Sequence, residues 1–128
     1  MKLSKIIAAY TVLETMTNHL YDYKVAYQLY TLKKDMVPHV QFYAAEELKM
    51  VEKYAEKNEN GKAVIQPDGK FNFMSAEAKE GFLADSEALG NVTADWSREV
   101  LKLPITPMIS MKQLEALDGF IEFGAEEK

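Results

Sequence analysis

The longest amphipathic segment of this sequence, residues 22–58, has the pattern of a single helix with a proline, Pro38, near its middle. At about 1.5 Å per residue, a continuous helix of that length would be roughly 55 Å long. A compact domain of this size has a radius of gyration of only about 14 Å. The helix is therefore expected to bend at Pro38, to protrude, or to pack against another chain. Each outcome would turn part of it into an interaction surface.

Pro38 has two interpretations. Inside a helix, proline removes one backbone hydrogen bond and clashes with the carbonyl four residues back, which costs about 3 kcal/mol unless the helix kinks. In the first turn of a new helix, capped by Asp35, the same proline would be tolerated. We expect a kink or a short break rather than a straight rod.

The first half of this segment carries two stripes of large side chains at helical spacing. One consists of Val25, Leu29, Leu32 and Met36, and the neighbouring one of Tyr23, Tyr27 and Tyr30. Tyrosine is amphipathic and is enriched at protein interfaces, so the second stripe is the candidate surface for a partner or for self-association. The alternative is core packing with the hydroxyl groups reaching solvent. Tyr23, Tyr27 and Tyr30 are the predicted partner-binding residues.

The remaining chain predicts an α+β fold. A helix is expected at residues 3–17, with Ile6, Tyr10, Leu13 and Leu20 on one stripe. Gly61 marks a change from helical to alternating periodicity, and Pro67-Asp68-Gly69 suits a tight turn, so residues 63–74 predict a β-hairpin and a small antiparallel sheet. Two short helices are expected at residues 75–89 and 110–117, a strand at 96–103, and an apolar docking segment at 120–123. We expect one domain, 1–128, with a helical part (1–58) and a mixed part (59–128).

Charge argues against nucleic acid as a partner. Residues 61–128 carry seven basic and twelve acidic side chains, and Arg98 is the sole arginine. Nucleic-acid affinity depends on clustered lysine and arginine. No apolar run approaches the roughly 18 residues of a membrane-spanning helix, and no signal peptide is evident. We therefore expect a cytoplasmic protein with no membrane association.

No residue cluster predicts catalysis. The chain has no cysteine, and His19 and His39 are far apart in sequence without a metal-ligand motif. Glycine-rich phosphate loops and the serine, histidine and acid pattern of a triad are absent from the sequence as well. We expect no cofactor, no metal and no enzymatic activity.

Four segments together resemble small uncharacterised proteins of phages and prophages of Gram-positive bacteria. They are MKLSKIIAAYTVLE, KVAYQLYTLKK, EKYAEKNENGKAVIQPDGKFNF and LKLPITPMISMKQLEALDGFIEF. The similarity extends over nearly the whole chain, and its most specific parts are the YAEKxExGK junction and the C-terminal LxALxxFIE segment. Neither is a catalytic motif. The resemblance implies a phage setting and assigns no functional residue.

Two functions fit that setting. The first is a binding protein that inhibits or sequesters a component of host antiviral defence in the cytoplasm of the host cell. The second is a structural or assembly protein of the virion. In both, the expected partner is a host or phage protein or a second copy of the chain, and a homo-oligomer is expected.

Overall fold

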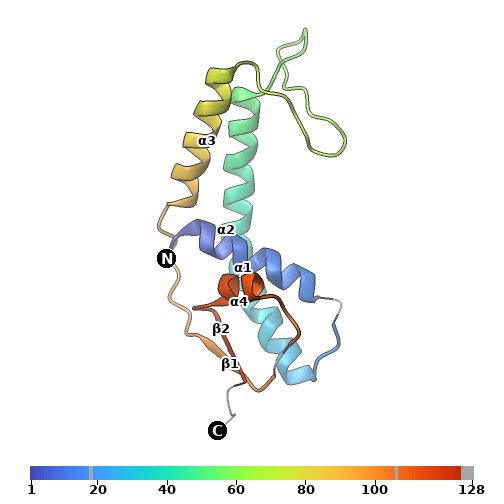
Figure 1. The fold of residues 1–128 in the computed structure, drawn as a ribbon, viewed down its shortest axis with the longest axis vertical. Coiled ribbons are helices and arrows are strands. Elements are labelled where there is room, and N and C mark those ends of the chain that lie inside the picture. The colour runs from blue at the N-terminus through green and yellow to red at the C-terminus, as the bar shows by residue number, and fades with distance from the viewer. Residues whose placement is uncertain (18, 106, 125–128) are drawn as a thin grey trace.

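The computed structural model describes residues 1–17, 19–105 and 107–124. Along the chain it has α1 (Leu3–Met16), α2 (Tyr23–Tyr54), α3 (Ala76–Gly90), β1 (Leu101–Leu103), α4 (Met111–Leu117) and β2 (Ile121–Phe123). Figure 1 shows an elongated molecule with two parts. The body contains α1, the first half of α2, α4 and both strands. The arm contains the second half of α2, α3 and the segment 55–75 between them.

α2 joins the two parts as one unbroken helix of 32 residues with Pro38 inside it. The axis changes direction in the region that α1 crosses (Figure 1), as expected for a kink rather than a break. Pro38 cannot donate to the carbonyl of Lys34. Both residues are exposed, so water can take the place of the missing donor. The helix ends at Tyr54, earlier than predicted, because Ala55 has an extended backbone (φ −74°, ψ 152°).

The hydrophobic core lies in the body. Its members come from α1, the first half of α2, β1, α4 and the chain around β2. The largest fully buried members are Ile6, Leu32, Met36, Leu103, Leu117 and Phe120. The segment after α4 docks on this core as predicted, with Phe120 and Ile121 buried. Leu20 was wrongly assigned to the α1 stripe, since its side chain is fully exposed at 100%. The arm contributes almost nothing to the buried set, so the body carries most of the apolar burial.

The strands of the body correct the predicted fold class. The sheet has two strands, β1 and β2, which run parallel with Leu101 opposite Ile121 and Leu103 opposite Phe123. α4 lies in the crossover between them, so β1, α4 and β2 form a small βαβ unit. The prediction of a small antiparallel sheet built on a hairpin is therefore wrong. The predicted strand at 96–103 shortens to its last three residues.

Segment 55–74 shows why the hairpin prediction fails. Three single antiparallel bridges join it, Ala55 with Phe73, Lys57 with Ala63, and Ile65 with Phe71. Residues 55–57 thus pair both with residues 63–65 and with residues 71–73. The amide of Glu56 donates to the carbonyl of Asn72, and the carbonyl of Glu56 accepts from the amide of Val64, each at 2.8 Å. Because every portion changes partner after one bridge, no continuous strand forms at residues 63–74.

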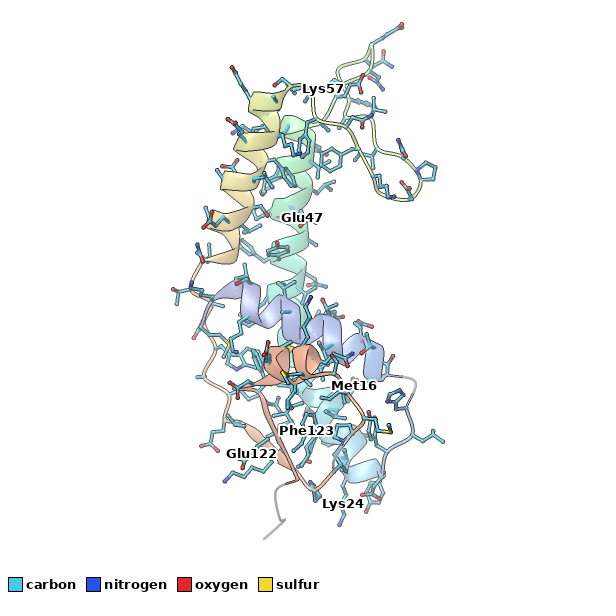
Figure 2. All side chains as sticks on the ribbon, in the orientation of Figure 1. Met16, Lys24, Glu47, Lys57, Glu122 and Phe123 are labelled. Atoms are coloured by element: carbon cyan, nitrogen blue, oxygen red, sulfur yellow. The ribbon has the colours of Figure 1, made fainter. Side chains whose placement is uncertain are left out.

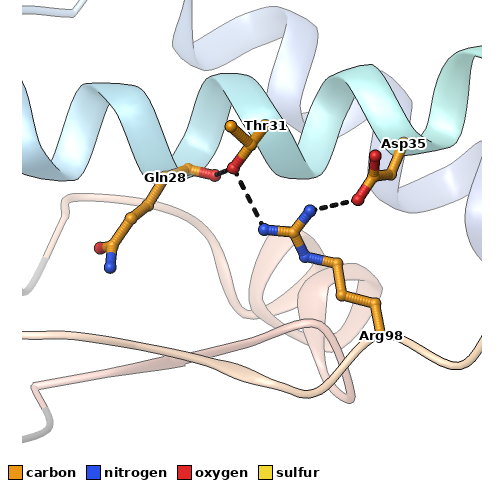
Figure 3. A network of polar contacts seen from close by, with 4 residues as sticks. All are labelled: Gln28, Thr31, Asp35 and Arg98. Atoms are coloured by element: carbon orange, nitrogen blue, oxygen red, sulfur yellow. Dashed lines mark hydrogen bonds and ion pairs between the residues drawn. The ribbon is translucent and has the colours of Figure 1, made fainter.

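The segment between α3 and β1 is fastened to α2 by the single arginine. Arg98 pairs with Asp35 and donates from Nη2 to Thr31 Oγ1 at 3.1 Å. Thr31 in turn donates to the carbonyl of Gln28 at 2.9 Å. Figure 3 shows this network along one side of α2. These contacts hold the chain that leads into β1 against α2.

Candidate interaction surface

The three predicted tyrosines lie on the surface of the body. Tyr23 is 75% exposed, Tyr27 67% and Tyr30 59%, which is unusual for large aromatic side chains in one helix. We call Tyr23, Tyr27 and Tyr30 the tyrosine face. Figure 2 labels Lys24, beside Tyr23, at the end of the body farthest from the arm.

The tyrosine face points away from the core. With about 100° per residue, the tyrosine positions fall within roughly 60° of one another on the helix. The buried stripe of Val25, Leu29, Leu32 and Met36 lies on the opposite side. The two stripes are therefore opposed rather than neighbouring, and the interpretation of these tyrosines as core residues does not hold. Their role in binding a partner stays a prediction.

A pocket of about 240 Å³ opens beside the tyrosine face, between the end of α1 and the start of α2. The buried side chains of Leu13, Met16 and Leu29 line it together with the exposed Tyr30 and His19. Pockets for cofactors and drug-sized ligands usually measure about 300–1,000 Å³. This pocket is smaller and mostly apolar, so it suits one side chain of a partner better than a cofactor.

Polar groups surround this pocket. Tyr21 Oη lies 3.3 Å from His19 Nδ1, and burial raises the pKa of the Tyr21 hydroxyl above its ordinary value. Lys33, which lines the pocket, pairs with Glu14 at 3.1 Å. Its ammonium group also lies 5.5 Å from the centre of the Tyr10 ring. The charge of Lys33 is thus already partly neutralised within the chain.

A second concave surface lies at the tip of the arm. The rings of Phe71, Phe73 and Phe82 are 5.1 to 5.7 Å apart, centre to centre, in tilted or edge-to-face pairs. They line an open pocket of about 480 Å³ together with polar residues such as Lys70 and Asn72. The alternating periodicity of residues 63–74 is consistent with Phe71 and Phe73 on one face. It missed Phe82, because nothing in the sequence brings α3 under this segment.

The two histidines lie in different surroundings. His19 is in the linker after α1, whereas His39 lies in α2 with its ring 5.9 Å from that of Trp96. Within residues 1–17, 19–105 and 107–124, no group of three or more histidine, aspartate or glutamate side chains could hold a metal ion. Likewise, no helix of the described ranges is both long and apolar enough to cross a membrane.

The tyrosine face, the pocket beside it and the pocket at the tip are the candidate sites that the geometry provides. No protein-family model, curated protein or solved structure matches this chain.

Proposed function

We propose that this protein acts by binding another protein chain, with the tyrosine face as the centre of the contact surface. The observation that carries the proposal is the 59–75% exposure of Tyr23, Tyr27 and Tyr30 on the side of α2 opposite the core. Tyrosine supplies large contact area together with a hydroxyl that can remain hydrogen-bonded. Central aromatic residues of an interface commonly contribute about 2 kcal/mol or more each.

The adjoining pocket supports the same proposal. A partner that covers Tyr30 would also cover the opening lined by Leu13, Met16 and Leu29. An apolar side chain of the partner could fill this pocket. The residues that contribute most to binding energy are commonly those that fill such a pocket. The face and the pocket together give one continuous contact area.

The biological setting that we propose follows from the resemblance to phage and prophage proteins. In that setting, the bound chain would be a component of host antiviral defence, which this protein inhibits or sequesters without catalysis. The support is the resemblance, combined with a candidate site that is a contact surface rather than a catalytic pocket.

The test is affinity capture from an infected or lysogenic host with wild-type protein and with a Tyr23→Ser, Tyr27→Ser variant. The matched control is Met74→Ser, Leu83→Ser, which removes two side chains of similar exposure (50% and 56%) from the arm. We expect wild type and control to retain the same protein and the tyrosine variant to lose it. Since each 1.4 kcal/mol is a factor of ten, affinity should fall by roughly 100-fold or more.

Circular dichroism of each variant establishes that it is folded before capture. Equal capture by all three proteins would refute the tyrosine face as the contact surface. Recovery of tail or capsid proteins in place of defence proteins would favour a structural role in the virion.

A further inference from the structure

The tyrosine face is the beginning of a longer regular stripe on α2. Counting along the helix, steps of four and three residues alternate from Tyr23 through Tyr27, Tyr30, Lys34 and Val37. The same alternation continues through Gln41, Ala44 and Leu48 into the arm. Alternating steps of three and four, a repeat of seven residues, define the contact line of a left-handed coiled coil. We call this set of positions the outer seam.

The outer seam is open along both halves of α2. Its members are exposed, Leu48 for example at 51%, except for the half-buried Val37. α1 and α3 pack on other sides of the helix. On the α3 side, the ring of Tyr54 contacts Gly81. Helix α2 therefore presents a seven-residue spacing on both sides of its bend at Pro38, and apart from the half-buried Val37 no element among the described residues covers it.

The two halves of the seam complement each other in size. The half in the body carries the three tyrosines, whereas the half in the arm carries Gln41, Ala44 and Leu48, each smaller than tyrosine. Cores pack best when large side chains face small ones. Two copies of α2 that run antiparallel would place the tyrosines of each copy against the smaller residues of the other.

Charge favours the same orientation. Residues 23–37 carry three lysines and Asp35, with Lys33 paired to Glu14 and Asp35 to Arg98. Residues 38–54 carry three glutamates and two lysines, with Glu46 paired to Lys49. The remaining charges are then net positive in the first half and net negative in the second. In an antiparallel pair, the basic half of one helix lies along the acidic half of the other. In a parallel pair, Lys34 would face Lys34 on the seam itself, and like charges in contact are destabilising.

The available area is sufficient for a stable contact. A buried aromatic residue covers about 150–250 Å², so six partly exposed tyrosines offer roughly 600–1,000 Å². The surface that they cover on the opposite copy is of similar size. The total therefore reaches the range of about 1,200–2,000 Å² that specific interfaces bury.

We propose that a second copy of this chain occupies the outer seam, with the two α2 helices antiparallel. This inference rests on the proposed function, because it takes the same tyrosine face as the contact surface, but it names a second copy rather than a host protein as the chain bound there. In this dimer the two arms lie at opposite ends of the pair, and the pocket at the tip of each arm stays free.

The oligomeric state of purified protein tests the inference without any host component. We expect light scattering after size exclusion to give a dimer at about 10 μM for wild type, and Tyr27→Glu to weaken dimerisation at least tenfold. Leu83→Glu places the same charge at an exposed apolar position of α3 and should remain dimeric. Circular dichroism shows whether Tyr27→Glu is folded, and Tyr27→Ser provides a milder variant of the same position.

Cross-linking tests the orientation of the two helices. Because the chain has no cysteine, an introduced cysteine is the sole thiol that can react. Single variants Ala26→Cys and Ala44→Cys are both at exposed positions of α2. We expect a short bifunctional maleimide to join Ala26→Cys chains to Ala44→Cys chains in a mixture. Efficient linkage of Ala44→Cys chains to one another would indicate a parallel pair and overturn the proposal.

The two proposals fail in different ways. A wild-type protein that is monomeric at 100 μM, but whose tyrosine variant loses capture of another protein, overturns the second copy and leaves the proposed function intact. If the protein forms a dimer that depends on Tyr27 and captures no other protein, the second copy is supported as the partner, and binding of a host defence component is refuted.

Discussion

The ring of Tyr54 packs directly on the backbone of Gly81, so that a β-carbon at position 81 would lie only 2.8 Å from Tyr54 Cε1. The ring has little freedom to withdraw. Its hydroxyl donates to Asp85 Oδ2 at 2.6 Å, and its centre lies 6.4 Å from that of Phe82 in an edge-to-face contact. Glycine at position 81 thus allows α3 to lie against the last turns of α2.

Replacement of Gly81 by alanine is expected to destabilise the protein. Alanine is favoured over glycine inside a helix by about 1 kcal/mol. Overpacking of a well-filled contact costs about 1–3 kcal/mol, and here the ring is held in place. We expect Gly81→Ala to lower the free energy of unfolding by about 1 kcal/mol, measured by urea denaturation.

The Tyr54→Ala background supplies the control for this substitution. Without the ring, only the helix preference remains, so adding Gly81→Ala to Tyr54→Ala should raise the free energy of unfolding by about 1 kcal/mol. If Gly81→Ala has the same effect in both backgrounds, the contact with Tyr54 does not explain the glycine.

The helices were predictable because their determinants are local. Ser75 Oγ accepts from the amide of Ala78 at 3.0 Å, and Ser110 and Gln113 form the capping box that their spacing predicts. Apolar periodicity and these caps lie within a few residues of one another. The helix at 75–89 is therefore found at Ala76–Gly90, and the one at 110–117 at Met111–Leu117.

Strand pairing was not predictable because it joins distant parts of the chain. Leu101 pairs with Ile121 across the α4 crossover, and neither three-residue strand has an alternating pattern long enough to recognise. The turn residues at 67–69 do produce a turn, with Gly69 at φ 84°. Directly beside that turn Ile65 pairs with Phe71. Farther from it, the pairings of Ala63 and Phe73 are taken by residues 55–57, which the sequence pattern had assigned to the helix.

The sequence identifies which tyrosines form the tyrosine face, but not that this face lies opposite the core. Helical spacing, in steps of four and three residues, identifies Tyr23, Tyr27 and Tyr30. Local sequence does not say which stripe of a helix faces the core when both contain large residues. The packing of α1 decides this, since Ile6, Ala9 and Leu13 join the Leu29 and Leu32 side in one cluster. The phenolic stripe is then left on the outside.

Arg98 is expected to stabilise the chain before β1 through its geometry as well as its charge. Its two terminal nitrogens contact Asp35 and Thr31, which are one turn apart on α2. Lysine cannot make both contacts from one planar group. We expect Arg98→Lys to cost about 1 kcal/mol in chemical denaturation, in the range of a single hydrogen bond to a charged or polar partner.

Thr31→Val provides the matched comparison, since it removes one of the two contacts and keeps the shape of the side chain. If the fork geometry matters, Arg98→Lys should add little further loss in a Thr31→Val, Asp35→Asn protein, in which both acceptors are altered. A full additional loss in that background would show that Arg98 stabilises the fold by some other contact.

The pair Tyr10 and Glu14 on α1 predicts a specific dependence of stability on pH. Hydrogen bonding to Tyr10, followed by the contact with Lys33 at 3.1 Å, lowers the pKa of Glu14 below its ordinary 4.5. The same hydrogen bond to Glu14, with burial, raises the pKa of Tyr10 above 10.0. Each shift means that the folded protein favours the pairing of a neutral phenol with a charged carboxylate.

The expected sign differs at the two ends of the pH range. The stabilisation from Glu14 is complete above pH 4.5 and is lost as the pH falls through its lowered value in the folded protein, whereas that from Tyr10 is lost as the pH rises through its raised value. The difference in unfolding free energy between wild type and Glu14→Gln should therefore be constant near neutral pH and should shrink in acid. Urea denaturation at several pH values measures this difference. Tyr10→Phe is the control: without the phenol, the pKa of Glu14, followed by carboxyl NMR, should move back towards its ordinary value. An unchanged Glu14 pKa in Tyr10→Phe would assign the shift to Lys33 alone.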